Sequence, residues 1–464
     1  MRFHHPAALV ASVMFLAFAG PAVAAPKTTT YRYGPVTVGP YQVKQSDFDY
    51  GIPKPVEDGY VTGMEVDIVD ANGRKVPINR LMLHHIVFSS IGSDFGQKHD
   101  GTCNNFTLLD SKSQVPGIAE RFYAAGEERA KLRLPDGYGY PVKGADRWAM
   151  TWMLMNHRKR TDRAYIQYKV TTDSAPRQAV KPYWLDVRNC LSDPVFDIPG
   201  GRKRGASTTE SATWNVPETG RIVAAAGHVH GGAKALSVNR GGCELYSSKP
   251  TWGLPSHPFY KVKPVLHEPG PINMSAFTSA RGFAVRRGDR VRLEADYDGE
   301  LMHTRVMGIM VAYLAPDAGA QPAARCGKPA DLRNYGADRP GRKKPPRFKV
   351  PLIGIGPDGT AREIPRPPGR RVSLRKGSSI GVYDGFFPSN VSLRAGSTVR
   401  WDFSGDELHN VTVANGPRGF SSKHLNSGRS YAKKLSVPGT YKLFCALHPV
   451  SMTATVKVVR RQRK

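Results

Sequence analysis

Up to Pro316, apolar residues occur in short runs that glycine, proline and aspartate interrupt. Examples are YVTGMEVDIV (60–69), AYIQYKVTT (164–172) and VMGIMVAYL (306–314). Runs of this length, rich in β-branched and aromatic residues and bounded by turn formers, indicate strands. The 47 Gly and 37 Pro among 464 residues also fit a turn-rich protein better than one built from long helices. We therefore expect an all-β chain, with one exception: residues 118–132 (IAERFYAAGEERAKL) have a helical composition and predict a short helix.

The first 24 residues predict a signal peptide. Arg2 precedes the apolar run AALVASVMFLAFAG, and Ala22-Val23-Ala24 forms a cleavage site before Ala25. No later apolar run in the sequence approaches the length of about 20 residues that a membrane-spanning helix needs. We expect an exported protein, extracellular or periplasmic after cleavage, without a transmembrane segment in the mature chain.

Export makes the five cysteines informative, because disulfides persist in oxidising compartments. Their odd number leaves one unpaired, which we expect to be Cys445 because it belongs to the metal-binding pattern described next. The other four, Cys103, Cys190, Cys243 and Cys326, are expected to form two disulfides. Their pairing stays open, since four cysteines allow three connectivities.

A group of sulfur and imidazole metal ligands lies near the C-terminus. Cys445, His448 and Met452 follow one another on a loop between the strand-like segments GTYKLF and TATVKVV, and His409 comes earlier in ELHNVTV. Two imidazoles, a thiolate and a weak thioether are the ligands of a blue-copper electron-transfer centre. Three ligands on one loop hold one geometry for both copper oxidation states, so little rearrangement accompanies electron transfer.

Residues 389–459 resemble the plastocyanin-type cupredoxins, which are small Greek-key β-sandwiches. The resemblance includes the His409-Asn410 pair and the GTYKLFC segment that leads into the ligand loop. It implies a type 1 copper bound by His409, Cys445, His448 and Met452, with Asn410 tying the two ligand-bearing segments together. The Cys-to-His spacing matches the family, whereas the His-to-Met spacing varies among its members and bears on the axial bond.

Histidines in the larger N-terminal part also have informative spacings. His228 and His230 are two residues apart, so in a strand they face the same side and can bind one metal ion. His84 and His85 are adjacent and face opposite sides, so they share an ion only where the strand is bulged or bent.

The segments LMLHHIVFSS, MLMNHRKRT, AGHVHGG and DGELMHTRVMGIM occur in an order that resembles the copper type II, ascorbate-dependent monooxygenases. That family includes the peptidylglycine hydroxylases and dopamine β-hydroxylase, and its core is two β-sandwiches that each present one copper across a solvent-filled cleft. The resemblance implies two copper sites, the first of His84, His85 and His157, and the second of His228 and His230 with Met302 or His303. One departure is Ala226, which stands where the peptide hydroxylases have an arginine that grips a substrate carboxylate.

Composition separates the domains. We expect a signal peptide at 1–24, monooxygenase-like β-sandwiches at 31–195 and 196–316, a basic Pro-rich linker at 317–376 and a cupredoxin domain at 377–460. The composition of the linker is typical of extended spacers. With 67 Lys+Arg against 38 Asp+Glu, the net charge of +29 also allows attachment to anionic cell-surface polymers, whereas the sequence has no specific nucleic-acid-binding signature.

The leading interpretation is an exported copper protein that transfers electrons through the type 1 centre, in exchange with the N-terminal coppers and with a redox protein or small reductant. The alternative is a copper-dependent monooxygenase that uses O₂ and a reductant. For that activity the sequence identifies neither the substrate nor a catalytic residue. A third hypothesis is a copper-holding module without catalysis that its positive charge attaches to a cell surface.

Overall fold

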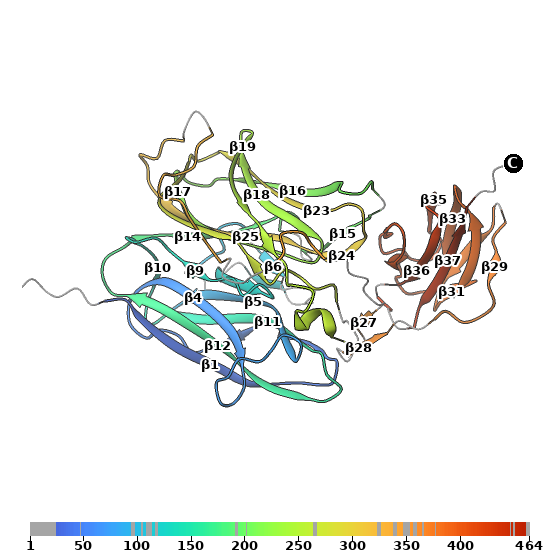
Figure 1. Ribbon diagram of the computed structural model, residues 1–464, viewed down its shortest axis with the longest axis horizontal. Coiled ribbons are helices and arrows are strands. Elements are labelled where there is room, and N and C mark those ends of the chain that lie inside the picture. The colour runs from blue at the N-terminus through green and yellow to red at the C-terminus, as the bar shows by residue number, and fades with distance from the viewer. Residues whose placement is uncertain are drawn as a thin grey trace, which may run out of the picture.

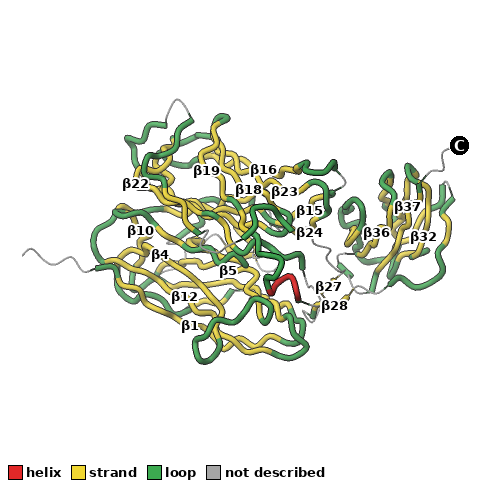
Figure 2. Tube along the Cα trace, in the orientation of Figure 1, coloured by secondary structure: helices red, strands yellow, loops and turns green. Residues whose placement is uncertain are grey.

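The computed structural model of the chain describes residues 25–46, 48–93, 98–103, 105–107, 114–116, 119–190, 194–200, 202–262, 267–322, 326–336, 341–346, 353–355, 360–363, 366–375, 377–445, 447–448 and 451–460. The expected signal peptide, 1–24, lies outside these ranges. They are all-β as expected, and the 3-10 helix η1 (Pro258–Lys261) is the single helix within them. No helix of the described part is long and apolar enough to cross a membrane. Figures 1 and 2 show two β-rich bodies stacked on each other and a smaller β domain beside them.

The first sandwich is built from the N-terminal strands β1 (Lys27–Val38), β2 (Val43–Gln45), β3 (Asp49–Tyr50), β4 (Gly59–Val69), β5 (Leu81–Gly92), β8 (Glu120–Gly126), β9 (Leu132–Arg133), β10 (Tyr138–Val142), β11 (Arg147–Asn156), β12 (Asp162–Asp173) and β13 (Gln178–Ala179). Strand β12 alternates between buried and less buried residues, whereas β5 and β11 are buried along most of their length. One sheet has the order β1-β12-β4-β10-β13, with β9 beside β4. The other has the order β2-β11-β5-β8, with β3 beside β11. A separate hairpin joins β6 (Asn105–Thr107) and β7 (Gln114–Pro116).

The second sandwich begins earlier than expected, because β14 (Lys181–Asp186) pairs with β25 (Gly308–Pro316). Its other strands are β15 (Phe196–Ile198), β16 (Ser207–Asn215), β17 (Gly220–Val229), β18 (Ala233–Arg240), β19 (Cys243–Ser248), β20 (Pro250–Thr251), β21 (Asn273–Met274), β22 (Ala276–Val285), β23 (Arg290–Asp298), β24 (His303–Val306) and β26 (Arg333–Tyr335). The main sheets have the orders β14-β25-β17-β22-β26 and β16-β23-β18-β19. Short pairs join β15 with β24 and β20 with β21.

The third domain is a separate β-sandwich with its own core around Trp401 and Tyr441. Its strands are β29 (Val372–Ser373), β30 (Ser379–Val382), β31 (Phe386–Phe387), β32 (Asn390–Arg394), β33 (Ser397–Phe403), β34 (Thr412–Asn415), β35 (Ser430–Leu435), β36 (Gly439–Phe444) and β37 (Thr453–Val459). One sheet has the order β29-β32-β37-β36-β34 and the other β31-β30-β33-β35.

The two N-terminal sandwiches share one apolar core. Val223 of β17 and Ile309 and Val311 of β25 are buried in the same cluster as Ile86 of β5 and Phe122 of β8. The opposite face of β17 and β25 packs on the rest of the second sandwich. One sheet of the second sandwich therefore lies between two cores, and the two sandwiches meet through apolar side chains.

The helix expected at 118–132 is wrong. Residues Glu120–Gly126 form β8, which pairs antiparallel with β5, and Leu132–Arg133 form β9 beside β4. Phe122, Tyr123 and Ala125 are buried in this arrangement. Burial against both sandwiches outweighs the weak helix preference of the local composition.

The basic segment 317–376 contributes structure to both of its neighbours. Its strand β26 extends the sheet of the second sandwich, and β29 pairs with β32 of the third domain. Between them, β27 (Ile353–Ile355) and β28 (Ala361–Glu363) form a hairpin. Cys326, from the same segment, is disulfide-bonded to Cys243.

Cysteine pairing follows the expectation. The disulfides are Cys103–Cys190 and Cys243–Cys326, a connectivity that the sequence left open. Cys445 is buried and carries no disulfide.

The third domain touches the second sandwich beside β24. The Gly419 N–H donates to the Pro199 carbonyl at 2.5 Å. The Met302 side chain packs against the core of the third domain, and a Cβ atom at Gly419 would lie 2.9 Å from its sulfur. Glycine at this position therefore permits the contact.

Candidate metal centres

The predicted C-terminal ligands come from the ends of neighbouring strands. His409 precedes β34, Cys445 directly follows β36 and Met452 directly precedes β37. Because β36 lies between β34 and β37 in one sheet, these ends meet at one edge of the domain. The N–H of His448 donates to the carbonyl of Cys445, and the N–H of Met452 donates to the carbonyl of His448. Folding of the β36–β37 hairpin therefore positions three of the four side chains.

Three donor atoms form a compact triangle at this edge. Cys445 Sγ lies 3.9 Å from His409 Nδ1 and 3.7 Å from His448 Nδ1. The two Nδ1 atoms are 3.2 Å apart. The centre of this triangle is about 2.1 Å from each donor, close to the bond lengths of about 2.0–2.3 Å that nitrogen and sulfur ligands make with a first-row metal ion. The donors therefore fit one such ion as they stand.

The surroundings of the thiol suit a metal-bound thiolate. Cys445 and Met452 are buried, and the Asn410 N–H donates to Cys445 Sγ at 3.4 Å. A donor aimed at the sulfur compensates the negative charge that a thiolate ligand carries. Burial lowers the pKa of His409 and the adjacent His448 lowers it further, which keeps the His409 imidazole neutral and able to bind metal. The His448 side chain is 32% exposed, so the donor set reaches solvent at this ring.

A second group of histidines lies where the two N-terminal sandwiches meet. His84 and His85 are on β5 of the first sandwich, whereas His228 and His230 are at the end of β17 of the second. The pairing of β5 with β11 shifts between His85 and Leu83, so His84 is the extra residue of a bulge. The His84 and His85 ring centroids are 3.9 Å apart. His85 Nε2 lies 3.0 Å from His230 Nε2, across the two sandwiches.

In three of these histidines, the Nδ1 atom faces a hydrogen-bond acceptor. His84 Nδ1 lies 3.1 Å from Glu127, His228 Nδ1 lies 3.0 Å from Glu128, and His230 Nδ1 lies 2.8 Å from the Arg305 carbonyl. An acceptor at Nδ1 favours a proton on that nitrogen, which leaves the Nε2 lone pair for a metal ion.

Burial keeps three of these imidazoles neutral, which is the metal-binding form. It lowers the pKa of His84 to about 4, and it lowers the pKa values of His85 and His230 well below the ordinary range. Burial also lowers the pKa of His228, but the carboxylates of Glu128 and Glu127 together raise it above its usual value.

The other predicted N-terminal ligands are not part of the close donor group formed by His84, His85 and His230. His157 is buried beside Phe259, with ring centroids 5.9 Å apart and no hydrogen-bond partner on either nitrogen among the described residues. His303 Nδ1 lies 2.8 Å from Glu268, and Met302 packs against the third domain. The close donor group of His84, His85 and His230 takes residues from both expected sites, which were His84, His85 and His157 on one side and His228, His230 and Met302 or His303 on the other. A continuous apolar core joins the two sandwiches where a solvent-filled cleft was expected.

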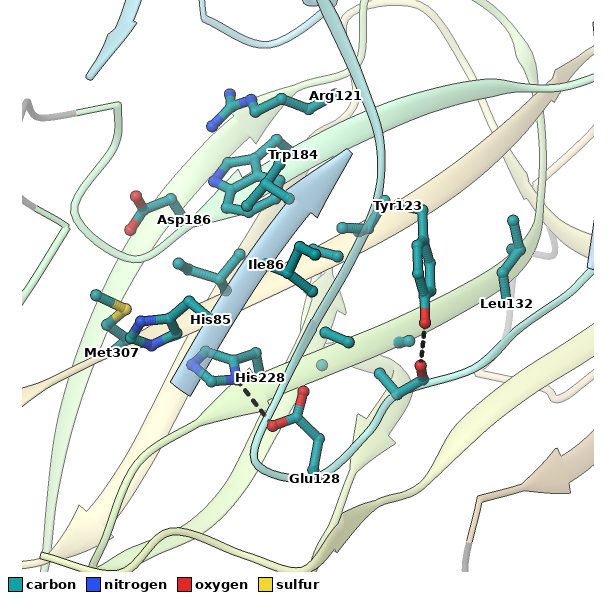
Figure 3. A pocket seen from close by; sticks show the side chains of 18 of the residues that line it. His85, Ile86, Arg121, Tyr123, Glu128, Leu132, Trp184, Asp186, His228 and Met307 are labelled. Carbon is teal, nitrogen blue, oxygen red and sulfur yellow. Dashed lines mark hydrogen bonds and ion pairs between the residues drawn. The ribbon is translucent and has the colours of Figure 1, made fainter. Parts of the chain in front are cut away.

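A small cavity of about 70 Å³ adjoins the histidine cluster. Its lining is mostly apolar, comes from both sandwiches, and includes His85, His228 and Ala226. Figure 3 shows the Met307 sulfur beside the His85 ring. Met307 therefore lines the same cavity as His85 and His228, whereas Met302 packs against the third domain.

Sequence reasoning missed several residues of this cluster. Glu127 and Glu128 follow β8 directly, and His267 Nε2 lies 2.7 Å from Glu127 with its ring 4.6 Å from that of His84. An acidic pair at the end of an apolar segment was the only available signal. None of these residues has a regular spacing from the predicted ligands, because tertiary packing brings them together.

Comparisons with known proteins find similarity over a fifth of the chain or less. Plastocyanin of Scenedesmus fuscus is 33% identical over 97 residues, which are 19% of this chain and 98% of that protein. Amicyanin-alpha of Methylorubrum extorquens is 34% identical over 67 residues, which are 14% of this chain and 56% of that protein. No protein-family model matches the chain.

Two solved structures are similar to this chain. A purple cupredoxin from Nitrosopumilus maritimus is 24% identical, covers 18% of this chain and 99% of its own, and has a TM-score of 0.17. An amicyanin from Paracoccus versutus is 26% identical, covers 20% of this chain and 84% of its own, and has a TM-score of 0.16.

Proposed function

Because this chain belongs, through its C-terminal cupredoxin domain, to the plastocyanin family, we propose that it is an electron-transfer protein with a type 1 copper centre. His409, Cys445 and His448 would hold the ion, and the Met452 thioether would be its weaker fourth ligand. The observation that carries the proposal is the donor triangle of 3.2, 3.7 and 3.9 Å, which suits one copper ion. When bound, copper accepts and returns one electron. The chain would supply a donor set that is buried except at His448 and is held in place by the surrounding strands.

Electrons enter and leave through His448, the partly exposed ligand of the set. The partner is a redox protein or a small reductant. A net charge of +29 favours partners with anionic surfaces, because opposite charge accelerates the encounter.

The protein works in an oxidising compartment outside the cytoplasm. Two disulfides support this assignment, since such bonds persist mainly in exported proteins. Residues 1–24 act as the export signal, which is cleaved before Ala25.

The cupredoxin exchanges electrons with a metal bound by the N-terminal histidines. The contact between Met302 and Gly419 supports this coupling, because it holds the cupredoxin against the second sandwich. The next residue, His303, is buried in that sandwich, and its partner Glu268 directly follows His267 of the histidine cluster.

A copper monooxygenase is the second candidate function, and the apolar cavity beside His85 and His228 favours it. Its volume of about 70 Å³ suits O₂ better than a large substrate. Oxygen uptake by the copper-loaded chain with ascorbate tests this activity. A glycine-extended peptide should not be hydroxylated, because Ala226 cannot make the charged hydrogen bonds of an arginine with a carboxylate.

The visible spectrum of the oxidised, copper-loaded full chain tests the electron-transfer proposal. We expect an intense thiolate-to-copper charge-transfer band in the wild type and its loss in Cys445→Ser with the fold retained. The matched control is His424→Ala, which removes an exposed histidine of the same domain and should keep the band. A colourless wild type that contains copper would rule the proposal out.

A further inference from the structure

We propose that His84, His85 and His230 bind one copper ion between the two N-terminal sandwiches. Neither sandwich contains the whole set, since the first two residues lie on β5 and the third follows β17. The site therefore differs from two separate copper sites, one in each sandwich. It concerns metal binding alone and does not depend on electron transfer at the cupredoxin centre.

The donor distances support a shared ion. One ring nitrogen from each of the three histidines lies within 4.8 Å of those of the other two. His85 Nε2 and His230 Nε2 are 3.0 Å apart. Two nitrogens that bind one ion at about 2.0 Å lie about 2.8–3.3 Å apart for bond angles of about 90–110°. The pair from opposite sandwiches already has this separation.

Hydrogen-bond acceptors fix the tautomers of two of the three histidines. Glu127 faces His84 Nδ1 and the Arg305 carbonyl faces His230 Nδ1, so each ring keeps its Nε2 free. Arg305 has a φ of 53°, a left-handed conformation that is uncommon for residues other than glycine. Such backbone strain is found at binding sites, where the surrounding structure maintains it. His85 Nδ1 is buried and has no hydrogen-bond partner among the described residues, so no protein acceptor fixes its tautomer.

Glu127 orients a ligand and does not bind the ion itself. Its Oε1 is 3.1 Å from His84 Nδ1 and 2.7 Å from His267 Nε2, and its Oε2 accepts the Gly270 N–H at 2.8 Å. Both oxygens therefore already face nitrogen groups. Carboxylates in this position commonly hold the outer nitrogen of a metal-bound histidine.

Copper is the metal that this donor set favours. Neutral imidazoles suit copper and zinc, and a nitrogen site binds copper most tightly among the divalent first-row metals. Because ligands come from both sandwiches, the ion also links them, and its binding should raise the melting temperature of the pair.

The test counts copper bound to the full chain after removal of loosely bound metal. Each of the single variants His85→Ala and His230→Ala should bind one copper ion fewer than the wild type. The double variant His85→Ala/His230→Ala should hold as much as either single variant. Two separate sites would instead lose one ion in each single variant and two in the double variant, which would overturn the proposal. Only differences in copper content are used, so absence of copper from the cupredoxin would not alter the result.

Control variants show whether a loss of copper comes from misfolding or from the neighbouring group of His84, Glu127 and His267. His99→Ala removes an exposed histidine of the first sandwich and should leave the count unchanged. Glu127→Gln should lower copper affinity about 10–100-fold, whereas Glu128→Gln, which touches only His228 among the four clustered histidines, should not. Equal effects of the two glutamine variants would count against the site. Loss of the ion in His267→Ala would assign it to His84, Glu127 and His267 and overturn the proposal.

Discussion

Among the proposed copper ligands, Met452 is the one whose removal should separate copper binding from tuning of the reduction potential. A thioether at this position is a weak axial ligand, and Met452 is buried directly before β37. Met452→Leu keeps the side-chain volume and leaves the thiolate and both imidazoles in place. We expect the blue band to persist and the reduction potential to rise, because oxidised copper loses a donor. Voltammetry of variant and wild type measures the shift, and a lower potential would contradict an axial role.

Met302 is a docking residue in this account and not a copper ligand. Its side chain packs on the cupredoxin core beside Gly419. Met302→Leu preserves the apolar contact, so the copper content of the full chain should equal that of the wild type. Metal analysis of the two proteins decides this point. If the variant binds one ion fewer, Met302 is a ligand after all.

The structure brings His409, Cys445 and His448 together as the sequence predicts, whereas it groups only some of the predicted N-terminal residues. Cys445, His448 and Met452 share one hairpin, so their spacing along the chain fixes their spacing in space. The bulge that lets His84 and His85 face one side was foreseen as a condition for a shared ion, and the structure has it. Glu127 and His267 were not foreseen, because their contact depends on how the two sandwiches pack.

Among the strands, β8 shows where local composition misleads. Its sequence ERFYAAG suits a helix, yet it pairs with β5 and buries Phe122 in the core that joins the sandwiches. When a short apolar stretch has no clear hydrophobic period, its secondary structure depends on the elements that pack against it. The runs at 60–69, 164–172 and 306–314 were read correctly as strands because turn residues bound them and they are rich in β-branched and aromatic residues.

The start of β12 is held by an ion pair that makes stability depend on pH. Asp162 accepts two hydrogen bonds from Arg80, at 2.8 and 2.9 Å, and contacts Arg158. Burial raises the pKa of Asp162, but the two arginines lower it more, so the net shift is downward. The carboxylate therefore stabilises the fold above its unfolded pKa of about 3.9, and this contribution is lost as the pH falls below that value.

Asp162→Asn should destabilise the first sandwich by about 1.5–3 kcal/mol at neutral pH, the range for a hydrogen bond to a charged group. The loss should shrink below about pH 4, where the unfolded carboxyl becomes protonated, and it should vanish once the folded carboxyl is protonated at its lowered pKa. Urea unfolding at several pH values measures both effects. A difference between the two proteins that does not change down to pH 2 would show that the ion pair is not responsible.

At the scale of the whole molecule, the contacts between the domains could not be read from the sequence. Three β-sandwiches follow one another, while the basic segment contributes β26 to one of them and β29 to another. Composition marked this segment as a spacer, because charge and proline content do not reveal strand pairing at its ends. The apolar contact between the N-terminal sandwiches was equally hidden, since buried strands of either sandwich have the same sequence pattern.

The net charge of +29 should control how fast the blue centre reacts with charged partners. Reoxidation by an anionic complex such as ferricyanide should slow as the salt concentration rises, because ions screen the attraction. A cationic cobalt complex is the matched control, and its reaction should accelerate under the same change. Stopped-flow absorbance of the blue band follows both reactions. The same salt response for both oxidants would show that charge does not direct the encounter.

Cyclic voltammetry of the copper-loaded full chain tests the central claim, that the cupredoxin centre passes single electrons without rearranging. We expect a reversible one-electron wave in the wild type, with reduction and oxidation of the blue band at the same potential. Cys445→Ser should lose this wave even when copper is supplied. A wild type that holds copper at this centre but shows no reversible wave, or that loses the ion on reduction, would contradict the account.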